Sequence, residues 1–195
     1  MGLDMYLNRV TFFSTHNRPE GVKIEVPGMT HIDPANVQEI REQVGYWRKA
    51  NQIHAWFVKY VQGGEDKCRP FSVSAEQLAE LLALCKQIVA VKDNAKRQEL
   101  AAELLPTQAG FFFGSTEYDD YYFEDIVDTI NILEPLVGEM LPVAETGEMT
   151  EAEMDPETKG LKETLESVGG TVKVFDPSKA PDWHTSVYYE YQSSW

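Results

Sequence analysis

The chain has 195 residues, of which 43% are hydrophobic, so it is long enough to bury a core as one domain or as one domain with an appendage. It has no run of about 18 apolar residues, and no basic stretch followed by an apolar one at its start, which argues against a membrane-spanning helix and a secretory signal. A formal net charge of −15 disfavours direct binding to nucleic-acid phosphates, which requires clusters of Lys or Arg. We therefore expect a cytoplasmic protein with no membrane partner.

The negative charge is concentrated in one region. Residues 115–170 contain 16 Asp or Glu against Lys159 and Lys162, a net charge of −14, whereas all other residues hold 16 acids against 15 bases, a net charge of −1. Acidic runs are usually solvated surface. The alternative is mimicry of nucleic acid, in which this region docks on a basic protein.

Cysteine and histidine spacing gives no indication of a metal site or a cofactor. Cys68 and Cys85 are not in a CxxC arrangement, so we expect free thiols rather than a disulfide. The four histidines show no HxH, HxxxH or HExxH spacing, and no serine lies in a GxSxG motif. We therefore expect no metal and no cofactor.

The N-terminal residues have the alternation of β-strands. Residues 3–13 predict a first strand, and residues 22–26 predict a second strand that could form a hairpin with it. In the first strand one face would carry Leu3, Met5 and Leu7, and the other Asp4 and Tyr6.

A long helix is predicted next. Asp33 and Pro34 resemble an N-cap followed by proline at the first helical position, and a helical pattern continues to about Gln62, with a bend or break at Gly45. Side chains spaced i, i+4 and i+7 stack along one line of a helix. On this helix that line holds Trp47, Asn51 and His54.

The middle of the chain predicts three helices and one buried strand. Ser74 and Gln77 form a capping box ahead of a regular apolar stripe, and residues 94–104 form a second short helix. Three consecutive Phe between glycines predict a buried strand at 110–114. A further helix begins at Asp119 or Asp120 and ends near 135–138.

The composition changes at residue 139. We expect residues 139–183 to form an acidic, partly mobile insertion with a linker at its start, a short helix at 157–168 and a small strand at 172–175. Residues 184–195 alternate again and predict a strand that pairs within the sheet, beside the first strand. Residues 1–138 and 184–195 then form one domain. The fold class is α+β: a small, mostly antiparallel sheet from 2–13, 22–26, 110–114 and 184–194, with three to five helices on one face.

Several motifs resemble a family of small proteins encoded by phages and prophages. They are Gly2-Leu-Asp-Met-Tyr-Leu7, Val44-Gly-Tyr-Trp-Arg-Lys-Ala-Asn51 with Ile53-His54 and Trp56-Phe57, Leu105-Pro-Thr-Gln108 with Gly110-Phe-Phe-Phe-Gly-Ser115 and Tyr118-Asp119, and Gln192-Ser-Ser-Trp195. The resemblance covers about 1–14, 36–138 and 184–195 and departs at 139–183. It implies no particular chemistry, and it places the protein in the host-cell cytoplasm.

The residues best suited to a binding site surround the predicted long helix. Planar ligands such as nucleobases are held by aromatic faces, Arg planes and amide edges. The predicted ligand-binding residues are Asp4, Tyr6, Trp47, Arg48, Asn51, His54, Gln108, Ser115, Tyr118 and Tyr121. The competing interpretation is that Trp47 packs the helix onto the sheet and that His54 is a core histidine.

These residues lead to three functional hypotheses. The first is an accessory protein that binds a small nucleotide-like ligand and sequesters a signal of host defence. The alternative is an acidic inhibitor that mimics nucleic acid and binds a basic host protein. A second alternative is a hydrolase that uses His54 as an acid or base, if Asp4 approaches it across the sheet. A non-enzymatic role is favoured, with a host protein or a second copy of the chain as the macromolecular partner.

Overall fold

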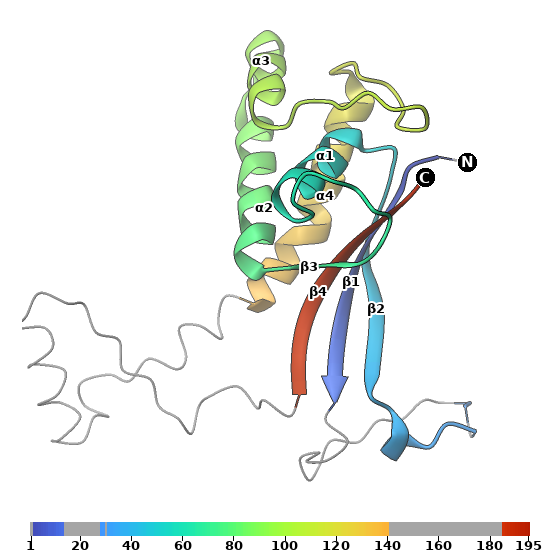
Figure 1. Cartoon of the computed structure of the whole chain (residues 1–195). Helices are drawn as coiled ribbons and strands as arrows, with labels where there is room; N and C mark the ends of the chain where they lie inside the picture. Colours follow the sequence, from blue (N-terminus) through green and yellow to red (C-terminus); the bar gives the residue numbers. More distant parts are fainter. Residues whose placement is uncertain (1, 14–27, 30, 141–184) are drawn as a thin grey trace, which may run out of the picture. The chain divides into compact units, whose positions relative to one another are not determined.

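The computed structural model describes residues 2–13, 28–29, 31–140 and 185–195 (Figure 1). This part of the chain forms one four-stranded antiparallel sheet and four α-helices, so the predicted α+β class is confirmed. The elements are β1 (Asp4–Phe13), a 3-10 helix η1 (Pro34–Asn36), β2 (Glu39–Arg48), α1 (Asn51–Tyr60), β3 (Phe71–Val73), α2 (Ala75–Ala90), α3 (Asn94–Leu104), α4 (Asp120–Met140) and β4 (Thr185–Ser194).

The sheet brings the two ends of the chain together. Its strand order is β2-β1-β4-β3, so β1 and β4 are the inner strands (Figure 1). Tyr6 in β1 pairs with Gln192 in β4 on one side and with Tyr46 in β2 on the other. The predicted pairing of the C-terminal strand beside the first strand is therefore confirmed. Residues 1–137 and 184–195 belong to one compact unit.

The two faces of β1 differ as the alternation predicts. Leu3, Met5 and Leu7 are fully buried, whereas Asp4 and Tyr6 lie partly exposed on the other face. Burial of an apolar side chain of this size stabilises the fold by about 1.5–3 kcal/mol. The apolar face of β1 is therefore a main element of the core.

Helices α1 and α4 pack on the apolar face of the sheet. The ring of Phe57 in α1 stacks on Tyr191 in β4 at 3.9 Å between centroids, and the Trp47 indole in β2 donates to Thr129 Oγ1 in α4 at 2.9 Å. A Cβ at Gly45 in β2 would lie 2.8 Å from Ile132 Cγ2 of α4. Gly45 thus permits the close approach of α4 to the sheet.

The predicted long helix between Asp33 and Gln62 is confirmed only for α1, residues 51–60, and is wrong for residues 39–48. Asp33 does cap a helix, but this is the short η1, and residues 39–48 form β2 instead. β1 pairs with these residues along its length, with a bulge opposite Leu7 and Asn8, and the pairing overrides a helical pattern that local propensity only weakly favours. Lys49, at φ 62°, turns the chain from β2 into α1. Trp47 therefore does not share a helix line with Asn51 and His54.

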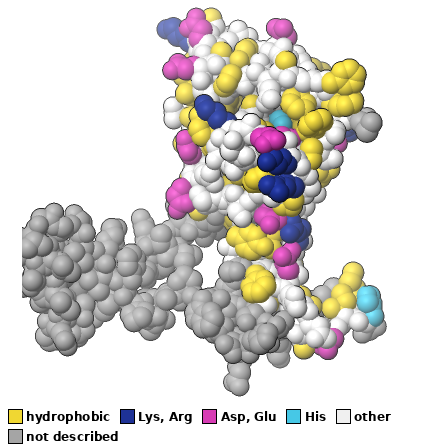
Figure 2. Space-filling model, viewed as in Figure 1, with side chains coloured by type: hydrophobic (Ala, Val, Ile, Leu, Met, Phe, Trp, Pro, Cys, Tyr) yellow, Lys and Arg dark blue, Asp and Glu magenta, His cyan; other side chains and the backbone are white. Residues whose placement is uncertain are grey.

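The predicted strand at 110–114 is also wrong, because these residues form a turn and no neighbouring strand pairs with them. The Phe113 amide donates to the Gly110 carbonyl, and Gly114 has φ 90°. Phe113 is buried, but Phe111 is 94% exposed, and hydrophobic side chains gather over the loop between α3 and α4 in Figure 2. Apolar composition alone did not distinguish a buried strand from a loop.

The three helices predicted for the middle of the chain are confirmed. The capping box of Ser74 and Gln77 is present at the start of α2, and α3 spans the predicted residues. Helix α4 begins at Asp120 but continues through Pro135 to Met140. None of the helices in the described ranges is long and apolar enough to cross a membrane.

Several predictions lie outside the described residues. They concern the strand at 22–26, the helix at 157–168, the strand at 172–175 and almost all of the insertion at 139–183. The short strand β3, which pairs with β4, was not predicted.

Candidate functional site: an acidic cleft at the start of helix α1

A cleft of about 340 Å³ lies where the β2–α1 junction meets the loop before α4 and the first turns of α4. This volume lies in the lower part of the range typical of small-molecule sites. Its lining residues are Arg48, Lys49, Asn51 and Gln52 from the junction, Gly114, Ser115, Glu117 and Asp119 from the loop, and Tyr121, Tyr122, Glu124, Asp125 and Asp128 from α4.

Two unusual backbone conformations shape one wall of the cleft. Lys49 and Gly114 both have positive φ, at 62° and 90°. A Cβ added at Gly114 would lie 3.1 Å from Lys49 Cβ, closer than ordinary van der Waals contact. Glycine at 114 therefore allows the loop to pack directly on the β2–α1 junction.

Asn51 holds the same loop against α1 through side-chain hydrogen bonds. Its side-chain Nδ2 donates to the carbonyl oxygens of Phe113 (3.1 Å) and Ser115 (2.7 Å), and its Oδ1 accepts from the Gln108 amide at 2.8 Å. The residue is 2% exposed. Asn51 therefore shapes the cleft through bonds to the protein.

The charges in the cleft are divided between its elements. The junction supplies two bases, Arg48 and Lys49, next to the start of α1, which has no side-chain cap and no acid in its first turn. A helix N-terminus favours negative charge. The loop and α4 supply five acids: Glu117, Asp119, Glu124, Asp125 and Asp128. One side of the cleft thus suits an anionic group, and the other suits hydrogen-bond donors.

Asp125 is the acid whose ionisation is most perturbed. Burial raises the pKa of its carboxyl to about 6; a hydrogen bond from Gln52 Nε2 at 3.2 Å opposes this rise, and the nearby Asp128 and Glu124 add to it. With a pKa of about 6 this carboxyl is mostly ionised at pH 7, and it has few protein donors to stabilise its charge. It is therefore suited to accept hydrogen bonds from a ligand.

Four of the predicted ligand-binding residues line the cleft: Arg48, Asn51, Ser115 and Tyr121. Arg48 and Tyr121 are largely exposed, and Tyr121 contributes an aromatic face with 76% of its surface accessible. Ser115 Oγ accepts from the Glu117 amide at 3.1 Å, which holds the loop in its turn. Arg48, whose Nε lies 3.9 Å from Asp4 Oδ1, and Tyr121 are the two of these four that are largely exposed.

The remaining predicted residues lie elsewhere. Asp4 and Tyr6 are on the outer face of the sheet, where Asp4 Oδ1 accepts from the Tyr46 hydroxyl at 2.6 Å. Gln108 contributes its backbone amide to Asn51, and Tyr118 lines a separate shallow hollow. Trp47 is a core residue, 3% exposed, but it lies in β2 and not on a helix that packs onto the sheet as the competing interpretation had it.

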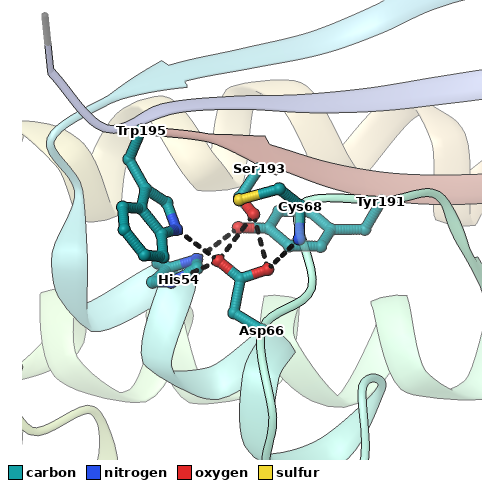
Figure 3. A network of polar contacts seen from close by, with 6 residues as sticks. All are labelled: His54, Asp66, Cys68, Tyr191, Ser193 and Trp195. Atoms are coloured by element: carbon teal, nitrogen blue, oxygen red, sulfur yellow. Dashed lines mark hydrogen bonds and ion pairs between the residues drawn. The ribbon is translucent and has the colours of Figure 1, made fainter.

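His54 belongs to a different group of polar contacts (Figure 3). It is 1% exposed, with Nδ1 2.8 Å from the Tyr191 hydroxyl and Nε2 3.5 Å from Asp66 Oδ2. Burial lowers the pKa of His54, and the Asp66 carboxylate only partly opposes this, so the neutral ring is favoured. The acid that approaches His54 is thus Asp66 and not Asp4, and the ring is enclosed by protein.

Asp66 is the centre of this group, which we call the Asp66 network (Figure 3). Its carboxylate accepts from Ser193 Oγ (2.7 and 2.8 Å), from Trp195 Nε1 (2.6 Å) and from the Cys68 amide (2.9 Å). Burial raises the pKa of Asp66, but these hydrogen bonds and His54 outweigh it and leave the pKa below its usual value. The network fastens the end of β4 to the loop after α1.

The predicted ligand-binding residues include none of the five acids that form the acidic wall of the cleft, and His54 alone from the Asp66 network. A partial signal existed for the wall, since Asp125 and Asp128 are three residues apart on one predicted helix. No such signal existed for Asp66, which lies in a loop 127 residues from Ser193. The predicted free thiols are confirmed: Cys68 is exposed and Cys85 is buried.

The acidic side chains are not arranged as a metal site. In the described part of the chain, no group of three or more His, Cys, Asp or Glu side chains could hold a metal ion. Comparison of the chain with protein-family models, with curated proteins and with solved structures gave no match.

Proposed function

We propose that the chain binds a small nucleotide-like ligand in the acidic cleft. The observation that carries the proposal is the division of charge within one cleft. Arg48 and Lys49 lie beside the start of α1, and the carboxylates of α4 line the other side. A nucleotide has the same division, with an anionic phosphate at one end and N–H donors on its base.

Each part of such a ligand has a suitable partner. The phosphate would lie between Arg48, Lys49 and the first turn of α1, where charge-assisted hydrogen bonds are strongest. The base would donate to Asp125 and stack on Tyr121, since aromatic faces accept nucleobases. Because the lining carries five acids against two bases, we expect a ligand with one phosphate to bind better than a triphosphate.

Isothermal titration calorimetry of the full chain with nucleoside monophosphates and triphosphates tests this proposal. We expect Lys49→Gln to weaken monophosphate binding about tenfold, because it removes one charge-assisted hydrogen bond. Lys67→Gln is the matched control, because Lys67 is also exposed and lies outside the cleft lining. We expect Tyr121→Ala to weaken binding without changing the melting temperature, because this side chain is 76% exposed. Equal binding by Lys49→Gln and Lys67→Gln would contradict the proposal.

The resemblance to phage proteins extends the proposal to a biological role. A protein that holds a nucleotide without converting it would sequester a signal of host defence. Native mass spectrometry of the protein purified from bacterial lysate is expected to show a co-purifying small molecule. That molecule should be released unchanged on denaturation, whereas recovery of a hydrolysed product would point to an enzyme.

One observation favours the second candidate, an acidic inhibitor that mimics nucleic acid. Asp120, Glu124 and Asp128 are exposed and repeat every four residues along α4. An inhibitor of this kind should interfere with DNA binding by host DNA-binding proteins in a gel-shift assay. The triple substitution of these residues by Asn or Gln, or deletion of 145–165, would abolish this interference. Binding to the cleft would survive the deletion, which separates the two candidates.

A further inference from the structure

A second, smaller cavity of about 130 Å³ lies between α1 and the end of α3. Its buried lining consists of Gln52, Trp56 and Leu105, which are 1–3% exposed. Its rim includes the exposed side chains of Lys59 and Glu103. The cavity thus has an interior of two apolar side chains and the Gln52 amide, with one base and one acid at its rim.

Trp56 contributes a hydrogen-bond donor that no protein group accepts. Its Nε1 is buried and has no partner. The other two tryptophans in the described ranges behave differently, because Trp47 Nε1 donates to Thr129 Oγ1 and Trp195 Nε1 donates to Asp66 Oδ2. A buried indole N–H usually finds an acceptor, so an unpartnered one beside a cavity indicates a missing partner.

Because Trp56 Nε1 has almost no accessible surface, a ligand reaches it only when a neighbouring side chain moves, and the rim residue Tyr60 is such a neighbour. Its ring lies 5.3 Å from the ring of Trp56, and it is 46% exposed. A rotation of Tyr60 towards solvent therefore loses little core packing. The size of the cavity limits what can then enter, since an apolar cavity of about 150 Å³ holds one benzene ring.

We propose that this cavity binds an uncharged single-ring compound whose carbonyl oxygen accepts a hydrogen bond from Trp56 Nε1. The ring would contact Leu105 and the aromatic pair of Trp56 and Tyr60. An uncharged ligand fits because the charges of Lys59 and Glu103 at the rim are opposite. The site is separate from the acidic cleft and does not depend on the function proposed for it.

Titration of the ¹⁵N-labelled full chain with benzamide tests the proposal, with toluene as the probe that lacks an acceptor. We expect benzamide to bind in about the millimolar range and to shift the indole N–H resonance of Trp56 downfield. Toluene should bind about tenfold more weakly. Trp56→Phe keeps an aromatic ring but removes the donor, so it should lose this preference for benzamide.

A cavity-filling variant keeps the test decisive if Trp56→Phe does not fold. Ala55 lines the cavity, so we expect Ala55→Leu to block benzamide. Ala79→Leu is the matched control, since Ala79 is also half-buried within a helix but lies outside the cavity lining. Circular dichroism checks the fold of each variant. An unmoved Trp56 resonance, or equal binding of benzamide by Ala55→Leu and Ala79→Leu, would overturn the proposal.

Discussion

Two aspartates contact the first turn of α1, and their surroundings have opposite effects on their charge. Asp66 faces His54 and accepts hydrogen bonds from Ser193, Trp195 and the Cys68 amide, so its pKa is lowered although burial alone would raise it. Asp125 accepts from Gln52 and lies near other acids, and burial raises its pKa to about 6.

The difference shows that the supply of hydrogen-bond donors, rather than burial alone, decides whether the charged form of a carboxylate is stabilised. Where the protein provides several donors, the charge is stabilised and joins distant segments of the chain. Where it provides few, the carboxyl is poorly stabilised and suits a ligand. Asp66 therefore has a structural role, and Asp125 is the better candidate for binding.

The largest expected effect comes from removing the strand that supplies two of the Asp66 donors. Deletion of residues 188–195 removes most of β4, an inner strand, with the fully buried Tyr191. We expect this deletion to prevent folding, measured as loss of the far-ultraviolet circular dichroism signal. Removal of Trp195 alone should leave a folded protein that is less stable by about 1–3 kcal/mol. A deletion variant that melts like the full chain would contradict this role of β4.

Asp66→Ala is expected to have the next largest effect. It leaves Ser193 and Trp195 without their acceptor and His54 without its charged neighbour. Because three groups lose their hydrogen bonds to the carboxylate, the unfolding free energy should fall by about 3–5 kcal/mol, measured by urea denaturation. Glu65→Ala is the control, because Glu65 is the exposed neighbour, whose side chain is 72% accessible and pairs with the exposed Lys67. Similar losses in both variants would refute the structural role of Asp66.

Asn51→Asp would place a third carboxylate at this helix turn, with the Gln108 amide as its donor and two backbone carbonyl oxygens beside it. It replaces an amide that donates to the Phe113 and Ser115 carbonyls with a group that only accepts. Two lost hydrogen bonds should lower the unfolding free energy by roughly 2–4 kcal/mol. The loop that lines the cleft should also lose amide-exchange protection, measured by hydrogen exchange. Unchanged protection of residues 108–115 would show that Asn51 does not hold this loop.

The smallest effect, and the only stabilising one, is expected for Asp125→Asn. Since the folded pKa of about 6 lies above the unfolded value, the carboxyl stabilises the fold when protonated and loses this contribution as the pH rises through 6. At pH 8 the variant should be more stable by about 1 kcal/mol, less than the full shift implies because the cleft is open to water. Below about pH 4 the advantage should vanish.

Thermal melts between pH 4 and pH 8 measure this dependence. Glu80→Gln is the control, since Glu80 is an exposed acid on α2 and its removal should give no comparable change across this range. An advantage of Asp125→Asn that does not vary with pH would show that the Asp125 carboxyl is not destabilised by its surroundings.

The sequence by itself determined the elements whose signals are local. Strands β1 and β4 alternate between apolar and polar residues, and Ser74 and Gln77 form a capping box that starts α2 within four residues of chain. The α+β class and the pairing of the two terminal strands follow from these signals. Arg48 and Tyr121 were also identified from the sequence as candidate site residues, and both line the cleft.

Only the tertiary structure decided what residues 39–48 and 110–114 would become. The first stretch has a helical pattern but pairs with β1, and the second is apolar but forms a turn that pairs with no strand of the sheet. The tertiary structure likewise decided which groups surround Asp66 and Asp125. Asp66 meets Trp195 across 129 residues of chain and Gln52 meets Asp125 across 73, and local spacing carries no information about contacts at such separations. The protonation of a carboxyl depends on the groups that folding brings around it, so the chemistry of this site follows from the packing of α1 against distant segments.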